Sequence, residues 1–107
     1  MKTTFLTRHL ESDDIFKNHF EEKAAWLGKH LKRFKEDLVY LHGMLEKNPH
    51  KEEFYATLSL FLPTTALHCR EAGADFASAI NLAFLDMARQ IEKHKAKLIR
   101  EKRRKAR

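Results

Sequence analysis

The sequence predicts an α+β fold of two layers, in which a four-stranded sheet carries both helices on one face in the order β-α-β-β-β-α. Three observations predict it. Two long stretches repeat apolar residues at intervals of three and four, which is the period of an amphipathic helix. Shorter stretches lack that period, and one of them alternates apolar with partly polar residues, as a strand does. Each predicted helix has one apolar stripe, so both helices need the same apolar face of the sheet.

The first two elements are a strand over residues 2–10 and a helix. Thr3, Thr4 and Phe5 favour a strand because they are β-formers without a helical period. Ser12 or Asp13 can then cap a helix, since a short polar side chain accepts from the free amides of the first turn. The apolar stripe that follows consists of Ile15, Phe16, Phe20, Ala24, Leu27, Leu31 and Phe34. Its spacing predicts an amphipathic helix that continues to the last of these residues.

Three further strands are predicted before the last helix. Residues 37–45 and 53–62 lose the helical period, and alternation in the second of these stretches implies a sheet covered on one side. Turn-forming residues at 47–50 separate the two stretches. A second turn at 63–65 precedes a fourth strand over 66–71.

The last third of the chain, residues 75–107, is predicted to be a single helix that begins in the core and ends as a basic rod. Asp75 suits its N-cap, and no Pro or Gly follows to stop the helix. Its apolar side comprises Phe76, Ile80, Ala83, Phe84, Met87, Ile91 and Leu98. At about 1.5 Å per residue, such a helix is longer than a small sheet, so we expect its end to overhang.

Positive charge is concentrated in this overhang. Residues 93–107 contain nine Lys or Arg and one acid, a net charge of +8, whereas the whole chain of 107 residues carries +6 and residues 1–92 carry −2. Five cations step by four, four, three and four and therefore share a helical face: Arg89, Lys93, Lys97, Arg100 and Arg104. Such a row suits contact with a polyanion backbone, although a basic helix end also complements the helix dipole and favours solubility.

Other functional classes lack a supporting motif in this sequence. There is no apolar run of about eighteen residues and no secretory signal pattern, which predicts a soluble cytoplasmic protein without a membrane partner. The single cysteine, Cys69, is expected in the core, and on a strand it points away from its neighbour His68. No metal-binding spacing and no phosphate-binding glycine loop occurs. We therefore expect no enzyme, no metal, no cofactor and no small-molecule substrate.

Several stretches also resemble a known family. They are TRHLE at 7–11 ahead of a capped helix, the long strand from Phe54 to Pro63, and DFASAIN at 75–81 followed by RQIEKHK at 89–95. Together they are similar to the ribosome hibernation factors, the family of the hibernation promoting factor and ribosome-associated inhibitor A, also called sigma 54 modulation protein or S30AE. The resemblance spans most of the domain and points to the short form of the family. At two positions where the family usually has lysine, this chain has Trp26 and Asp86.

The resemblance implies a fold similar to the double-stranded RNA-binding domain over residues 1–97, followed by a basic helical extension over 98–107 that we expect to be mobile. It also implies binding to the small ribosomal subunit near the decoding centre, where the protein blocks messenger and transfer RNA positions and silences translation. In such binding, Lys and Arg side chains contact phosphates across an RNA groove, and the release of counterions supplies the affinity. The candidates, with the first taken from the family match, are Arg8, Lys17, Lys23, Lys29, Arg89, Lys93, Lys97, Arg100 and Arg104.

Two alternative functions remain open at this point. The chain could be a general structured-RNA-binding protein that acts through its basic tail. It could also be an interaction protein whose tail meets an acidic protein or a membrane surface. The lysines of the first helix are interleaved with acids, and solvated surface charge explains them equally well. The sequence does not indicate the oligomeric state.

Overall fold

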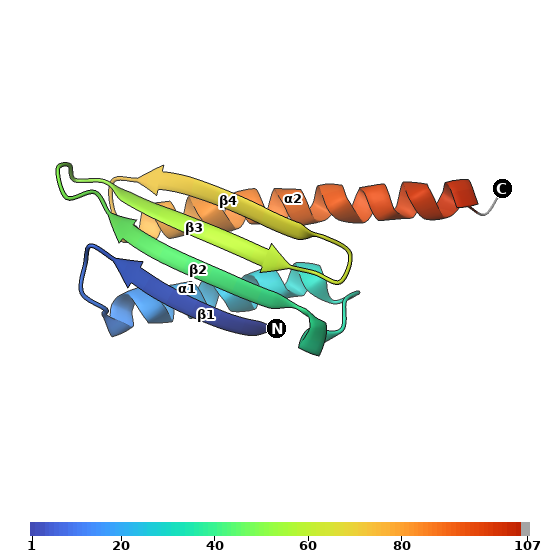
Figure 1. Cartoon of the computed structure of the whole chain (residues 1–107), viewed down its shortest axis with the longest axis horizontal. Coiled ribbons are helices and arrows are strands. Elements are labelled where there is room, and N and C mark those ends of the chain that lie inside the picture. The colour runs from blue at the N-terminus through green and yellow to red at the C-terminus, as the bar shows by residue number, and fades with distance from the viewer. Residues whose placement is uncertain (106–107) are drawn as a thin grey trace.

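The computed structural model describes residues 1–105 and contains the two predicted layers. Figure 1 follows the chain from the N-terminal strand to the long C-terminal helix. The elements in order are β1 (Lys2–Arg8), α1 (Asp14–Gly28), the 3-10 helices η1 (Lys29–Leu31) and η2 (Glu36–Leu38), β2 (Tyr40–Lys47), β3 (Phe54–Phe61), β4 (Ala66–Gly73) and α2 (Phe76–Lys105). The predicted order β-α-β-β-β-α is confirmed.

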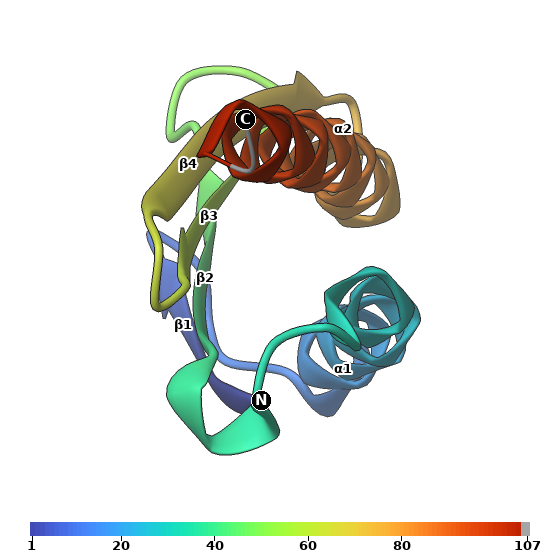
Figure 2. The ribbon, with the colours of Figure 1, turned by 90° about the vertical axis from the view of Figure 1, so that its right-hand side faces the viewer.

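The four strands form one mixed sheet in the order β1-β2-β3-β4. β1 pairs with β2 in parallel, whereas β2 with β3 and β3 with β4 are antiparallel. α1 and α2 lie on the same side of this sheet, as predicted, and Figure 2 shows the two helices from the end of the molecule. The opposite face carries no helix within residues 1–105, and we call it the open face.

The core lies between the sheet and the two helices and is centred on Phe20 of α1. The Phe20 ring stacks on Phe5 of β1 at a centroid distance of 4.8 Å and meets Phe84 of α2 at 5.6 Å. Gly43 of β2 lies directly beneath the ring, in a position where an added Cβ would collide with it. The absence of a side chain at residue 43 therefore lets α1 approach the sheet closely.

Several predicted boundaries differ from the structure. β1 ends at Arg8 rather than at residue 10, and β2 and β4 each end two residues later than predicted, at Lys47 and Gly73.

Two further differences have a clear physical reason. The apolar stripe of the first helix continues to Phe34, but α1 ends at Gly28 and one turn of 3-10 helix follows. That tighter turn still buries Leu31, which is 5% exposed, so the apolar spacing persists after the α-helix has ended. The second strand begins at Tyr40 rather than at 37, because residues 36–38 form η2 and turn Leu38 toward solvent.

Both predicted helix caps are present. The backbone N–H of Ile15 donates to Asp13 Oδ1 at 2.9 Å, so Asp13 rather than Ser12 is the cap of α1. The backbone N–H of Ser78 donates to Asp75 Oδ1 at 2.7 Å, and this bond holds the pKa of Asp75 below its usual range. Each carboxylate satisfies an amide that would otherwise lack a partner in the first turn.

α2 has 30 residues and extends well past the end of the sheet (Figure 1). Its last polar contacts with the body are His94 Nε2 with Thr64 Oγ1 at 2.7 Å and Lys95 Nζ with the carbonyl of His30 at 3.1 Å. Residues 96–105 therefore extend beyond the body, and we call them the overhang; the molecule is 56 Å long and 24 Å by 17 Å across. Residues 106–107, the end of the predicted helix and basic extension, lie outside the described residues.

Candidate nucleic-acid interface

The five-cation row of α2 lies on an exposed side of the helix. Its members are all exposed: Arg89, Lys93, Lys97, Arg100 and Arg104. Within residues 1–105 none of the five forms an ion pair with a carboxylate. Exposed cations without an ionic partner keep their full charge for phosphates, and their binding would release counterions into solution. The predicted row is therefore exposed along α2, with Glu101 beside its last three members.

A neighbouring lysine, Lys95, has a different role. Its Nζ lies 3.0 Å from Glu92 Oε1 and donates to the carbonyl of His30, whose ring Nδ1 is also 3.0 Å from Glu92 Oε1. These contacts lower the pKa of Glu92, first through the hydrogen bond with His30 and then through the one with Lys95. The cluster of Lys95, Glu92 and His30, which we call the clasp, joins η1, directly after α1, to α2 at the root of the overhang.

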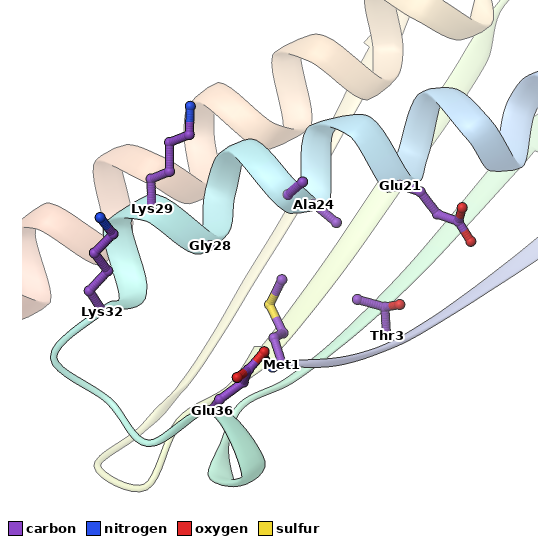
Figure 3. Close-up of a pocket in the computed structure, with 9 residues that line it drawn as sticks. Met1, Thr3, Glu21, Ala24, Gly28, Lys29, Lys32 and Glu36 are labelled. Atoms are coloured by element: carbon purple, nitrogen blue, oxygen red, sulfur yellow. Dashed lines mark ion pairs between the residues drawn. The ribbon is translucent and has the colours of Figure 1, made fainter.

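The three candidate lysines of the first helix do not share a face. Lys23 is half-buried in the groove between α1 and α2, next to Trp26 and Leu85. Lys29, the first residue of η1, lines a cavity of about 460 Å³ together with Met1 and Glu36 (Figure 3). Glu36 in that cavity forms an ion pair with the N-terminal ammonium at 3.4 Å. The structure thus brings Lys23 close to α2, whereas Lys29 lines a different depression.

Lys17 and Arg8 occupy two further positions. Lys17 is exposed in the first turn of α1. Arg8 lies at the end of β1 on the open face, where its Nε is 3.6 Å from Glu46 Oε2. Arg70 of β4 approaches the other oxygen of Glu46 at 3.5 Å. The sheet separates Arg8 from the helix cations, so one flat partner cannot touch both groups.

The structure also groups cations that the sequence pattern did not single out. Arg33, in the loop after η1, lines a depression of about 370 Å³ together with Ile99, Lys102 and Arg103 of the overhang. This places a cation of the N-terminal half beside the basic end of α2. Little in the sequence indicates this contact. Arg33 follows the first helix closely, but whether it lies near α2 depends on where α1 ends.

The structure also places two other residues considered above for their chemistry, Cys69 and His68. Cys69 is buried, its thiol donates to the carbonyl of Ala83 at 3.2 Å, and burial, together with the charge of Asp86, raises its pKa to about 12. As predicted, His68 points to the opposite face and contacts Ser59. Residues 1–105 contain no group of three potential metal ligands and no helix that is both long and apolar enough to cross a membrane.

Comparison with known families identifies the chain. Residues 4–99 match the family model described as sigma 54 modulation protein / S30EA ribosomal protein. The chain belongs to this family. The match covers most of the sequence and both layers of the fold, and it confirms the predicted resemblance to the hibernation factors. No match was found among curated proteins.

Solved structures with a similar fold include two from bacteria. The N-terminal domain of Thermus thermophilus Protein Y superposes with a TM-score of 0.72 at 22% sequence identity, covering 88% of this chain and 99% of that one. A ribosomal subunit interface protein from Coxiella burnetii superposes with a TM-score of 0.71 at 16% identity, covering 90% of this chain and 99% of that one. At such identities the likeness shows the fold alone.

Membership in the S30EA family makes the chain a ribosome-associated modulation protein of the hibernation type. The family is non-enzymatic, and its association with ribosomes implies a cytoplasmic location. The family model ends at residue 99, so it includes the five-cation row only as far as Lys97. Arg100 and Arg104 lie beyond the matched region.

Proposed function

We propose that this chain binds small-subunit ribosomal RNA near the decoding centre, where it occupies messenger and transfer RNA positions and silences translation. Family membership supports a ribosomal partner. The observation that carries the RNA contact is the five-cation row of α2, which is exposed and without ionic partners in the described residues. From Arg89 to Arg104 the row is about 22 Å long, enough to follow several phosphates along an RNA groove.

Charge distribution supports an orientation for this contact. The overhang is strongly positive while residues 1–92 carry a net charge of −2. The electrostatic field of this charge distribution draws the basic end toward RNA first. It keeps most of the slightly negative body away from phosphates. The clasp holds the root of the overhang against η1, so the row meets RNA from a fixed base. Lys23, near the groove between the helices, lies on the same side of the sheet and can add a contact.

The test is chemical footprinting of small-subunit RNA by the full chain at low and moderate salt. We expect protected nucleotides to cluster at the decoding centre. The variant R100Q/R104Q should bind more weakly and show a salt dependence of log affinity reduced by about one for each cation removed. The control variant K35Q/K51Q removes the same charge from two exposed loop positions and should bind like the original chain.

A general structured-RNA-binding function is the second candidate, because six of the ten residues from 96 to 105 are cations and only one is an acid. That function needs no preferred site. It predicts footprints scattered over exposed helices and equal competition by an unrelated duplex RNA. Protection confined to the decoding centre would exclude it, and scattered protection would contradict the proposal above.

A further inference from the structure

The open face of the sheet is unusually aromatic at one end. In a sheet with one solvated face, outward positions are normally polar. Here the outward positions of the two central strands include Tyr40 on β2 and Phe61 on β3, which lie opposite each other in the register. Phe61 is 44% exposed although its strand, β3, is one of the two central strands. No helix within residues 1–105 covers these rings, so their apolar surface is available to a partner.

The rings form a short line across three strands. The centroids of Tyr40 and Phe61 are 5.9 Å apart, and those of Phe61 and His68 on β4 are 6.1 Å apart. Hydrogen bonds hold the ends of the line. The Tyr40 hydroxyl lies 3.0 Å from Thr4 Oγ1, and His68 Nδ1 lies 2.9 Å from Ser59 Oγ. We call Tyr40, Phe61 and His68 the aromatic line.

The charge on the open face suits a polyanion. Among the outward strand positions, all of which the structure describes, the one carboxylate is Glu46. Arg8 and Arg70 both contact it, so its charge is neutralised. Lys2 is exposed and pairs in register with Tyr40 at the edge of the aromatic line. A phosphate backbone could therefore cross this end of the face without meeting an unpaired negative charge.

The aromatic line and the overhang occupy the same end of the molecule. β2 begins and β3 ends at the end of the sheet past which α2 projects (Figure 1). The turn between β3 and β4 contacts α2 through Thr64 and His94, at the root of the overhang. A nucleic-acid strand held by the overhang would therefore have the aromatic line within reach around that turn.

We propose that the aromatic line is a stacking surface for the unpaired bases of single-stranded RNA. Exposed aromatic side chains on a sheet bind such bases because every base has a flat π-face, whatever the sequence. Tyr40 and Phe61 on the central strands would each stack a base, with His68 extending the platform and Lys2 meeting a phosphate. The choice of RNA as the partner rests on the proposed function, but the surface is separate from the helix row.

The experiment measures binding of the full chain to a fluorescent oligouridine of about twelve nucleotides. Its partner probe is an oligomer of the same length and charge that has ribose and phosphate but no bases. We expect the oligouridine to bind more tightly than the probe without bases. Phe61→Ala should weaken oligouridine binding by about 5- to 150-fold and leave the other probe unaffected.

Two variants make the result interpretable. Leu82→Ala removes an apolar side chain of α2 that is 44% exposed, the same fraction as Phe61, and should leave oligouridine binding unchanged. Phe61→Tyr keeps a ring and should restore binding, while circular dichroism checks that each variant is folded. Equal binding of the two probes, or full oligouridine binding by Phe61→Ala, would overturn the inference.

The outcome is independent of the outcome for the proposed function. If Phe61→Ala keeps oligouridine binding but no longer sediments with ribosomes, the open face contacts a ribosomal protein and the stacking proposal is wrong. If the original chain binds oligouridine through its bases but does not sediment with ribosomes, the stacking surface stands and the ribosomal function is wrong.

Discussion

Gly43 and Gly28 differ in what a methyl group would meet, and the difference predicts opposite changes in stability. A Cβ at residue 43 would collide with the ring of Phe20, which is 2% exposed and cannot move aside. We expect Gly43→Ala to lower the free energy of unfolding by about 1–3 kcal/mol, as overpacking does. Urea denaturation measures this change. A variant as stable as the original chain would show that α1 can shift away from the sheet without loss.

Gly28→Ala is the matched control, because no atom lies within 4 Å of the Cβ it would add and the residue has helical dihedral angles. It should raise the free energy of unfolding by about 0.4–1 kcal/mol, since alanine restricts the unfolded chain more than glycine does.

Cys69 is predicted to be inert while the protein is folded. The thiolate is the reactive form of cysteine, and burial raises the pKa of this thiol to about 12, so almost none is ionised near neutral pH. A disulfide-exchange reagent should label the native chain at pH 8 only as fast as the chain unfolds. Rapid labelling without urea would show that the strand carrying Cys69 opens locally.

At the scale of elements, the contribution of the clasp to the free energy of unfolding should depend on pH. The pKa of Glu92 is lowered in the folded chain, so its contribution to stability is present above the carboxyl's ordinary pKa and is lost as pH falls through the lowered value. Glu92→Gln should therefore be less stable than the original chain at pH 7. The difference should be smaller at pH 3, which is below the ordinary pKa of a glutamate, than at pH 7.

Urea denaturation at both pH values measures this difference, and Glu52→Gln, an exposed glutamate in the loop between β2 and β3, is the control. A stability difference for Glu92→Gln that is the same at both pH values would show that the clasp does not depend on the carboxylate.

The overhang should be helical but weakly protected until it binds RNA. Within residues 96–104 the structure shows no polar contact between α2 and the body, and like charges such as Arg100 and Arg104 repel each other one turn apart. Amides at 98–105 should exchange with solvent much faster than amides at 80–91 in the free protein. Addition of small subunits should slow their exchange. Strong protection of the overhang in the free protein would contradict the expected mobility.

Much of the fold was predictable because its signals are local. The strand and helix periods, Asp13 and Asp75 as caps, and the turn at 63–65 are visible within a few residues of sequence. The end of α1 was not, because the apolar spacing through Leu31 is compatible with either an α-helix or a 3-10 turn. Tertiary packing decided between them.

The candidate site was predictable only in part. The row on α2 follows from helical spacing alone, and the structure places all five cations on one exposed side. Three features depend on strand register and on the relative placement of distant elements. They are the position of Arg8 on the open face, the nearness of Arg33 to the overhang, and the aromatic line. Residues as far apart as Tyr40 and Phe61 become neighbours only when the strands pair, and no local pattern carries that information.

At the scale of the whole molecule, the fold separates two kinds of surface. A compact two-layer body with a slightly negative charge positions one long helix, and that helix carries the positive charge past the end of the sheet. Because the family is ribosome-associated, we propose that this arrangement delivers the row of α2 to ribosomal RNA. Such binding must depend on salt, since it releases counterions from the RNA.

The most direct test is sedimentation of the full chain with purified small subunits through sucrose gradients at low and high salt, with R100Q/R104Q and K35Q/K51Q run in parallel. We predict that the full chain and K35Q/K51Q travel with the subunits at low salt, that R100Q/R104Q is partly released, and that high salt releases all three. A chain that stays at the top of the gradient at both salt concentrations, or that sediments equally well at both, would contradict the account.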